Sequence, residues 1–206
     1  MYLPPQFQSD DPAHAAALMR GHPLASLVSN DDEGFPFVTH MPLHLQERAD
    51  GALALLGHCA RANPHWRYLQ ARPEALAVFQ GPQAYMSPSV YPDLARVPTW
   101  NYLAVHCRVR ATPIEGEQAQ DALLKALIGD HEPAYAAQWR ALGEAFARKM
   151  LAGIAAFELR VLAVQCKIKL NQHRPQSHAA MHAQYRAGTP DERALADWMR
   201  RLGMVH

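Results

Sequence analysis

Residues 24–56 read LASLVSNDDEGFPFVTHMPLHLQERADGALALL, and this stretch decides the fold class. It contains three apolar segments, at 24–29, 35–45 and 52–56. The two short polar segments between them, Asp31-Asp32-Glu33-Gly34 and Ala49-Asp50-Gly51, have the composition of tight turns. Strands joined by short glycine-containing turns pair with their sequence neighbours, so the stretch predicts an antiparallel meander of three strands.

Further strands are predicted downstream by short apolar runs and by alternation of apolar with polar residues. They are expected at 75–79 and 83–86, on either side of Gly81-Pro82, and at 100–112 and 154–164. Helix-start residues and Ala-rich or Leu-rich composition predict helices at 13–20, from Asn63-Pro64 to Gln70, at 115–129 and 132–150, and at 176–186 and 190–202. Thr189 is the expected N-cap of the last helix.

These elements predict a mainly β protein with added helices, built as a closed or partly closed antiparallel barrel with helices outside it. We expect a barrel domain over residues 1–170, interrupted by a helical hairpin at about 115–150. A C-terminal helical extension is expected over 171–206.

The composition limits the classes of function. The 20 basic and 19 acidic residues give a formal net charge of +1, so the chain has no long-range attraction for nucleic acid. No run of about 18 apolar residues is present and no signal peptide is recognised, which predicts a cytoplasmic protein without a membrane span. Three widely spaced cysteines are expected to be reduced and packed in the core.

Four segments carry more polar and aromatic residues than strands or turns require. In the first, Gly57 to Trp66, Arg61 precedes a helix start and could bind an anion together with the helix N-terminus. The alternative is that Arg61 is solvated and Asn63 only caps the helix. In the second, Tyr85 to Pro92, the hydroxyls of Ser87 and Ser89 suit phosphate or ribityl oxygens, unless this is a plain surface loop.

The third segment, 97–102, places Asn101 between Trp100 and Tyr102. Aromatic side chains pack on planar rings and an amide pairs with a ring edge, although these aromatics could equally belong to the core or an interface. The fourth segment, 167–173, brings cations and amides directly after the last strand, either as ligands or as a solvated linker.

Motifs for several other functions are missing from the sequence. It has no Gly-rich dinucleotide fingerprint, no phosphate-binding P-loop and no nucleophile elbow. His178 and His182 have helical ligand spacing, but no third ligand stands at a convincing distance from them. We therefore expect no metal site.

Taken together, the motifs resemble the PaiB family of FMN-binding negative transcriptional regulators. The resemblance begins at Met1-Tyr2-Leu3-Pro4 and continues through His22 to Ala25 and His40 to Leu43. It then covers the segments 57–66, 81–92 and 98–102, and ends with Lys169-Leu170 and Gln172. It thus spans nearly the whole chain, in order.

The resemblance implies a split β-barrel like that of the pyridoxamine-phosphate oxidases, and a bacterial homodimer with two FMN sites at the subunit interface. It implies that Arg61, Ser87 and Lys169 lie near the FMN phosphate. The full set of cofactor-binding residues it implies is Thr39, His40, Met41, Pro42, Gly57, His58, Ala60, Arg61, Asn63, Ser87, Ser89, Trp100, Asn101, Lys169 and Gln172.

Two segments depart from the family pattern. The family usually has Lys-Leu-Ser-Gln-Asn where this chain has Lys169-Leu170-Asn171-Gln172-His173, and a Trp where it has Val90. These departures affect the expected pocket for the flavin ring and leave the expected fold unchanged.

Two functions are compatible with such a flavin protein. One is the transcriptional regulator that the family name implies, although no basic recognition helix is evident in the sequence. The other is an FMN-dependent oxidoreductase acting on a small substrate, for which His40, His58 and His106 are possible proton donors. No catalytic residue is identified, and a barrel that serves only as an interaction module is a third reading.

Overall fold

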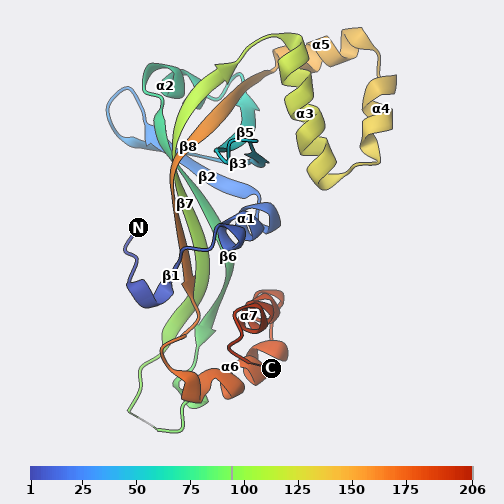
Figure 1. Ribbon diagram of the computed structural model, residues 1–206. Coiled ribbons are helices and arrows are strands. Elements are labelled where there is room, and N and C mark those ends of the chain that lie inside the picture. Colours follow the sequence, from blue (N-terminus) through green and yellow to red (C-terminus); the bar gives the residue numbers. More distant parts are fainter. Residues whose placement is uncertain (94, 206) are drawn as a thin grey trace. The chain divides into compact units, whose positions relative to one another are not determined.

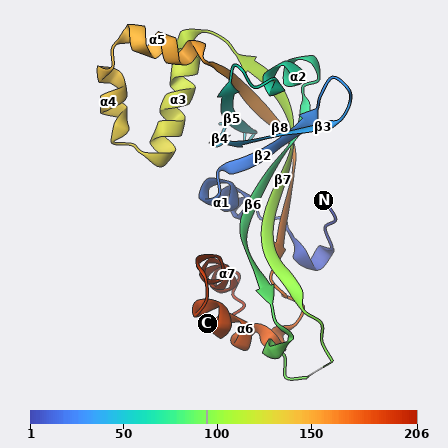
Figure 2. The same cartoon turned by 180° about the vertical axis from the view of Figure 1, so that it is seen from behind.

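A computed structural model describes residues 1–93 and 95–205 of the chain (Figures 1 and 2). Its strands are β1 Gln8–Ser9, β2 Leu24–Asn30, β3 Pro36–Pro42, β4 His44–Glu47, β5 Leu53–Ala60, β6 Glu74–Met86, β7 Thr99–Ile114 and β8 Ile154–Lys169. Its α-helices are α1 Pro12–Gly21, α2 His65–Ala71, α3 Glu117–His131, α4 Tyr135–Ala141, α5 Glu144–Ala152, α6 His178–Arg186 and α7 Pro190–Arg201. Short 3-10 turns occupy Pro5–Phe7, Pro88–Val90 and Pro175–Ser177.

The strands form one sheet with the hydrogen-bonded order β3-β2-β6-β7-β8-β5-β4, and β1 pairs with β8. Neighbouring strands such as β2 and β3, β2 and β6, and β5 and β8 pair antiparallel. Leu24 lies opposite Pro42 in the β2–β3 hairpin, and His44 lies opposite Leu56 in the β4–β5 hairpin. β3 and β4 stand at opposite ends of this order although only Leu43 separates them in the chain. The sheet must therefore curl without closing, which confirms a split antiparallel barrel.

The break at Leu43 corrects the expected single strand over 35–45 and the three-stranded meander. Pro42 lacks the N–H that a continuing ladder would need. The next residue turns inward: Leu43 is buried and its N–H donates to the carbonyl of Pro23 at 3.0 Å. β3 consequently pairs with β2, and β4 pairs with β5.

The two short strands expected around Gly81-Pro82 are one strand, β6. Gly81 does not make a turn there. A Cβ atom on Gly81 would lie 2.8 Å from Leu18 Cδ2 and 3.2 Å from Leu103 Cβ. Close packing against these leucines requires a glycine at this position. The Gly-Pro pair resembles a turn in the sequence, but here the glycine serves packing within a continuous strand.

The helical insertion also differs from the predicted hairpin. The segment expected as one helix over 132–150 forms two helices, α4 and α5, because Gly143 adopts a positive φ of 78° between them. The final strand runs beyond the predicted residue 164 to Lys169, so part of the fourth polar segment belongs to β8.

The chain divides into two compact units. The central unit comprises residues 19–79 and 106–164, and the terminal unit comprises 1–18, 80–105 and 165–206. Strands β6, β7 and β8 contribute residues to both. The core of the central unit includes Leu27, Leu55, Phe79 and Leu159, and that of the terminal unit includes Leu103, Ile168, Tyr185 and Leu195. The boundary at residue 170 stays a prediction.

The three cysteines are buried and unpaired, as expected. Burial raises the pKa of the Cys166 thiol to about 11 and raises that of Cys59, so both thiols stay protonated near neutral pH. No helix among residues 1–93 and 95–205 has the length and apolar character needed to cross a bilayer.

The predicted cap of the last helix is confirmed and supplies a test of local stability. Thr189 Oγ1 accepts from the Glu192 N–H at 3.3 Å, and Glu192 Oε2 accepts from the Thr189 N–H at 2.7 Å. Replacing Thr189 with alanine removes one half of this capping box, so we expect the free energy of unfolding to fall by about 1 kcal/mol in urea titrations. Thr189→Ser should keep wild-type stability. Equal stability of the alanine and serine variants would contradict the assignment.

Candidate functional site

A buried polar network joins β3 to the start of α2 in the central unit. Asn63 Nδ2 donates to Thr39 Oγ1 at 3.1 Å, and the same hydroxyl lies 2.7 Å from Nδ1 of His65. The other ring nitrogen, His65 Nε2, lies 2.9 Å from Ser29 Oγ. Asn63 Oδ1 also accepts from the His65 N–H at 3.0 Å. The structure therefore brings together two predicted site residues, Thr39 and Asn63.

Two members of this network, Ser29 and His65, were not predicted. His65 is fully buried, and burial lowers its pKa from 6.5 to about 4. The imidazole is consequently neutral at pH 7 and has one donor and one acceptor nitrogen. The signal was its place directly after the helix-start residues Asn63-Pro64, but a helix start does not show which side chain of the first turn faces the core.

The other predicted residues of β3 alternate between solvent and core. His40 is exposed and its Nδ1 lies 2.9 Å from Ser26 Oγ, and Pro42 is exposed as well. Met41, between them, is buried with 3% exposure. A ligand lying on the outer face of β3 would therefore meet the side chains of His40 and Pro42, and Met41 only through its backbone.

The predicted residues of β5 differ in their surroundings. A Cβ on Gly57 would lie 2.5 Å from Leu43 Cδ2, so the glycine permits a close approach there. His58 lies opposite Ala156 of β8, and its Nδ1 is buried without a hydrogen-bond partner among the described residues. Burial lowers the pKa of His58, which keeps its ring neutral at pH 7. Ala60 is exposed at the strand end.

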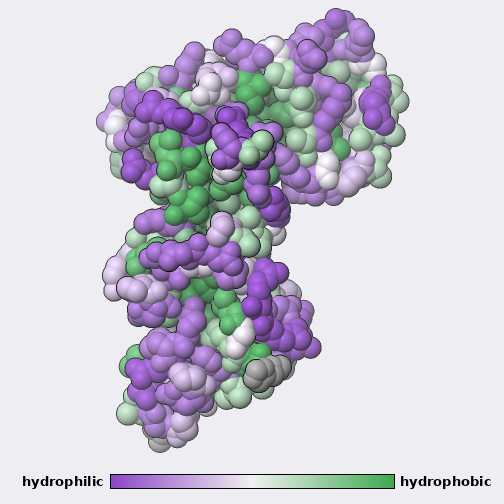
Figure 3. Space-filling model, in the orientation of Figure 1, coloured by the Kyte–Doolittle hydropathy of each residue, from purple (hydrophilic) through white to green (hydrophobic). Residues whose placement is uncertain are grey.

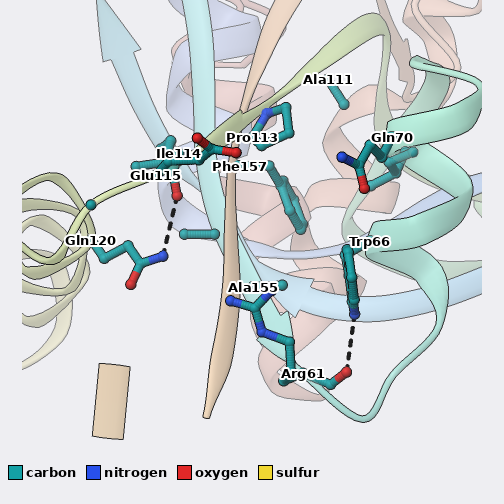
Figure 4. Close-up of a pocket in the computed structure, with 13 residues that line it drawn as sticks. Arg61, Trp66, Gln70, Ala111, Pro113, Ile114, Glu115, Gln120, Ala155 and Phe157 are labelled. Carbon is teal, nitrogen blue, oxygen red and sulfur yellow. Dashed lines mark hydrogen bonds between the residues drawn. The ribbon is translucent and has the colours of Figure 1, made fainter. Parts of the chain in front are cut away.

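Arg61 lies beside a pocket of about 270 Å³ in the central unit (Figure 4). Its guanidinium carbon is 5.2 Å from the centre of the Trp66 ring, and its carbonyl accepts from Trp66 Nε1 at 3.0 Å. No carboxylate of residues 1–93 and 95–205 forms an ion pair with Arg61. Arg61 is thus an available cation.

In the terminal unit, Lys169 borders a second pocket, of about 290 Å³. Its Nζ donates to Thr99 Oγ1 and to the carbonyl of Trp100, each at 2.7 Å. Burial, and secondarily the charge of Lys167, lower the pKa of Lys169. Arg96 and Arg174 line the same pocket, and Arg96 is already paired with Asp93 at 2.8 Å. None of the lining residues is acidic, so Lys169 and Arg174 suit the pocket to an anion.

Ser87 and Ser89, also in the terminal unit, are joined by a hydrogen bond of 2.9 Å between their hydroxyls. Ser87 Oγ additionally accepts from the Ser89 N–H at 3.2 Å and caps the 3-10 turn Pro88–Val90. Val90, which stands where the family usually has Trp, is buried. Trp100 is half exposed, and its Nε1 donates to Gln83 Oε1 at 3.0 Å.

Asn101 and Gln172 are engaged by their own unit. Asn101 is fully buried, and its Nδ2 donates to the Tyr185 hydroxyl at 2.9 Å, while its Oδ1 has no partner among the described residues. Gln172 closes the end of β8: its Oε1 accepts from the Leu170 N–H and its Nε2 donates to the Ile168 carbonyl. Both side chains have structural roles that the sequence did not predict.

Asn171, the departure from the family pattern, has a structural explanation. It is the only non-glycine residue with positive φ among those described, at 62°, a conformation that asparagine tolerates well. Its amide donates to Ser177 Oγ at 2.8 Å and its Oδ1 accepts from the Tyr91 hydroxyl at 3.2 Å. The residue therefore organises the wall of the second pocket.

Comparisons with known proteins connect this arrangement to flavin proteins. A family model described as "Putative FMN-binding domain" matches residues 1–163. The chain is 31% identical over 178 residues to the protease synthase and sporulation protein PAI 2 of Bacillus subtilis (strain 168), covering 86% of this chain and 84% of that protein. It is 30% identical over 148 residues to the uncharacterized protein YKL070W of Saccharomyces cerevisiae, covering 62% and 86% of the two.

Two solved structures share the fold. The flavocytochrome Anf3 from Azotobacter vinelandii superposes with a TM-score of 0.62 at 18% identity, covering 80% of this chain and 70% of that chain. The FAD and heme binding protein from Mycobacterium smegmatis superposes with a TM-score of 0.62 at 21% identity, covering 79% and 73%.

Proposed function

Because this chain belongs to the PaiB family of FMN-binding proteins, FMN is its cofactor, and we propose that the fifteen residues predicted from the sequence hold it. Nine of them, Thr39 to Pro42, Gly57, His58, Ala60, Arg61 and Asn63, lie in the central unit. The other six, Ser87, Ser89, Trp100, Asn101, Lys169 and Gln172, lie in the terminal unit. We propose that Arg61, Ser87 and Lys169 bind the phosphate.

The donors present fit FMN. Its phosphate carries nearly two negative charges and accepts several hydrogen bonds, which requires cations and hydroxyls that are not already neutralised. Arg61 has no acidic partner among the described residues, Lys169 borders a pocket without acidic lining, and Ser87 adds a hydroxyl. The partnerless Nδ1 of His58 supplies one further polar atom for a ligand.

The residues have separate tasks in this proposal. Bound FMN supplies hydride and electron transfer, and the protein supplies binding and orientation. The Thr39–Asn63–His65 network fixes the connection between β5 and α2, from which Arg61 projects. The rings of His58 and His65 are neutral at pH 7, so in that region Arg61, and not these histidines, supplies the positive charge for the phosphate. Trp100, half exposed, offers an aromatic face to a planar ring.

We propose that two copies of the chain form the complete site, as the family resemblance implies. Large apolar side chains are exposed along the strands, among them Leu24, Val38, Tyr85, Trp100 and Leu162. Figure 3 shows hydrophobic side chains at the surface over the sheet. A second copy would remove this apolar surface from water. A monomer by light scattering at micromolar concentration would contradict the homodimer.

Beyond FMN binding, we propose that the protein regulates gene expression, which is supported by the family match and the 31% identity to PAI 2.

One observation favours the alternative of an FMN-dependent oxidoreductase. Arg186 of α6 and Arg200 of α7, which supply positive charge to the C-terminal helices, both pair with Asp197. The single Asp197 carboxylate offsets part of this positive charge and so weakens the attraction for DNA phosphates. A gel shift with promoter fragments at physiological salt and an anaerobic NADPH titration of the flavin absorbance separate the two functions.

FMN binding itself is tested with two substitutions. Arg61→Gln and Lys169→Gln should each weaken FMN binding about tenfold or more, because each removes a charge-assisted hydrogen bond to phosphate. Flavin fluorescence quenching during titration measures the Kd.

Arg67→Gln is the matched control. Its guanidinium also lies against Trp66, at 5.1 Å, but is not among the proposed ligands, so its Kd should stay within about twofold of wild type. If all three variants bind FMN like the wild type, the proposed phosphate site is wrong.

A further inference from the structure

The pocket beside Arg61 has features that the flavin site does not account for. It lies wholly within the central unit, between α2, the start of α3, and the adjoining ends of β7 and β8. Figure 4 shows Arg61 and Trp66 bordering it from the α2 side, and Glu115 and Gln120 from the α3 side. Among these, only Arg61 belongs to the proposed flavin ligands.

The pocket is too small to enclose a whole flavin. Its volume of about 270 Å³ lies below the roughly 300–1,000 Å³ of sites that enclose drug-sized ligands. This volume is about nine times the ~30 Å³ that one water molecule occupies in the liquid. Each non-hydrogen atom of a ligand occupies a similar or smaller volume. A single substituted six-membered ring fits such a volume.

The walls of the pocket are apolar and partly aromatic. Four of the lining residues are buried, namely Leu69, Ala155, Ala156 and Phe157, and Trp66 is half-buried. Aromatic walls favour an aromatic guest, because ring pairs add to the gain from burying apolar area. The ligand body is therefore apolar and flat.

The polar groups select the charge of the ligand. Arg61 contributes a planar fork of donors, which matches a carboxylate, and no acidic group pairs with it in the part of the chain that the structure describes. Glu115 also lines the pocket and disfavours a doubly charged group such as phosphate. The amides of Gln70 and Gln120 complete the rim.

We propose that this pocket binds a small aromatic monocarboxylate, with the carboxylate at Arg61 and the ring between the apolar walls. The inference goes beyond the flavin function and does not depend on it. A guanidinium has donors on two edges, so Arg61 can meet this ligand and an FMN phosphate separately.

Benzoate is the probe, measured by calorimetry on the full-length protein. We expect a Kd on the order of 1 mM or tighter. Benzamide, a neutral molecule of the same shape, should bind at least about fivefold more weakly, because it cannot form the charged pair with Arg61. No heat of binding for benzoate, or equal affinity for both molecules, would overturn the proposal.

Two glutamines on α3 give a matched pair of variants. Gln120→Trp places a large side chain at the pocket, whereas Gln118 lies two residues away and does not line it. We expect Gln120→Trp to weaken benzoate binding about tenfold or more, with FMN binding unchanged, and Gln118→Trp to leave both at wild-type values. Gln70→Trp places a large side chain at the pocket from the α2 side and should also weaken benzoate binding. Agreement between the two variants would show that the loss does not come from a local folding defect in α3.

The outcomes separate this inference from the flavin proposal. If Gln120→Trp and Gln118→Trp bind benzoate equally, the pocket is not the site. If Gln120→Trp weakens FMN as much as benzoate, the pocket is part of the flavin site and the inference fails. If FMN does not bind but the benzoate results hold, only the flavin proposal fails.

Discussion

Lowering the pH from 7 to 4 should destabilise the folded chain by about 3 kcal/mol through His65 alone. Burial lowers the pKa of this histidine from 6.5 to about 4 in the folded state. Between these values the unfolded chain binds a proton that the folded chain does not. The contribution of the neutral His65 ring to the free energy of unfolding is therefore fully present above about pH 6.5, and it is lost as the pH falls toward 4. His65 is fully buried, so solvent does not screen this effect.

Urea unfolding at pH 7, 5.5 and 4 gives the free energy of unfolding of the wild type and of His65→Gln. The effect of His65 is the difference between the pH dependences of the two proteins. The variant should be less stable at pH 7, because it loses contacts to Ser29 and Thr39, but its stability should depend less steeply on pH. His131→Gln is the control, since His131 is exposed, and should keep the wild-type slope. An unchanged slope in His65→Gln would show that the ring is not held neutral in the folded state.

Replacing Gly81 with valine should cost about 3 kcal/mol, although valine normally favours strands. A Cβ at this position would approach Leu18 Cδ2 to 2.8 Å, Leu103 Cβ to 3.2 Å and the Leu103 carbonyl oxygen to 3.3 Å. Both leucines are at most 1% exposed, so neither has free space into which it can move. The two further methyl groups of valine add to the overlap.

Equilibrium urea unfolding of Gly81→Val, Gly81→Ala and Gln80→Val tests the packing argument. Gln80 is the exposed neighbour on the same strand, so Gln80→Val should stay within about 0.5 kcal/mol of the wild type. Gly81→Ala should fall between the other two. If valine at 81 is tolerated as well as valine at 80, close packing does not require the glycine.

The site was predictable to the extent that its residues lie in continuous motifs. Thr39 and Asn63 were both expected among the cofactor-binding residues, and their side chains do meet. The role of Asn101 was not predictable, because its amide is engaged by Tyr185 of α6, which no local pattern connects to it. The Tyr185 hydroxyl, for example, lies 84 positions along the chain from Asn101.

The sequence by itself determined the mainly β class, the family and the local ends of several elements. The turn at Asp31 to Gly34 and the capping box at Thr189 depend on residues within four positions of one another, so local composition is sufficient to specify them. Tertiary structure alone decided the break at Leu43, the straight passage through Gly81 and the burial of His65. Each of these depends on contacts with residues distant in the chain, where packing outweighs local preference.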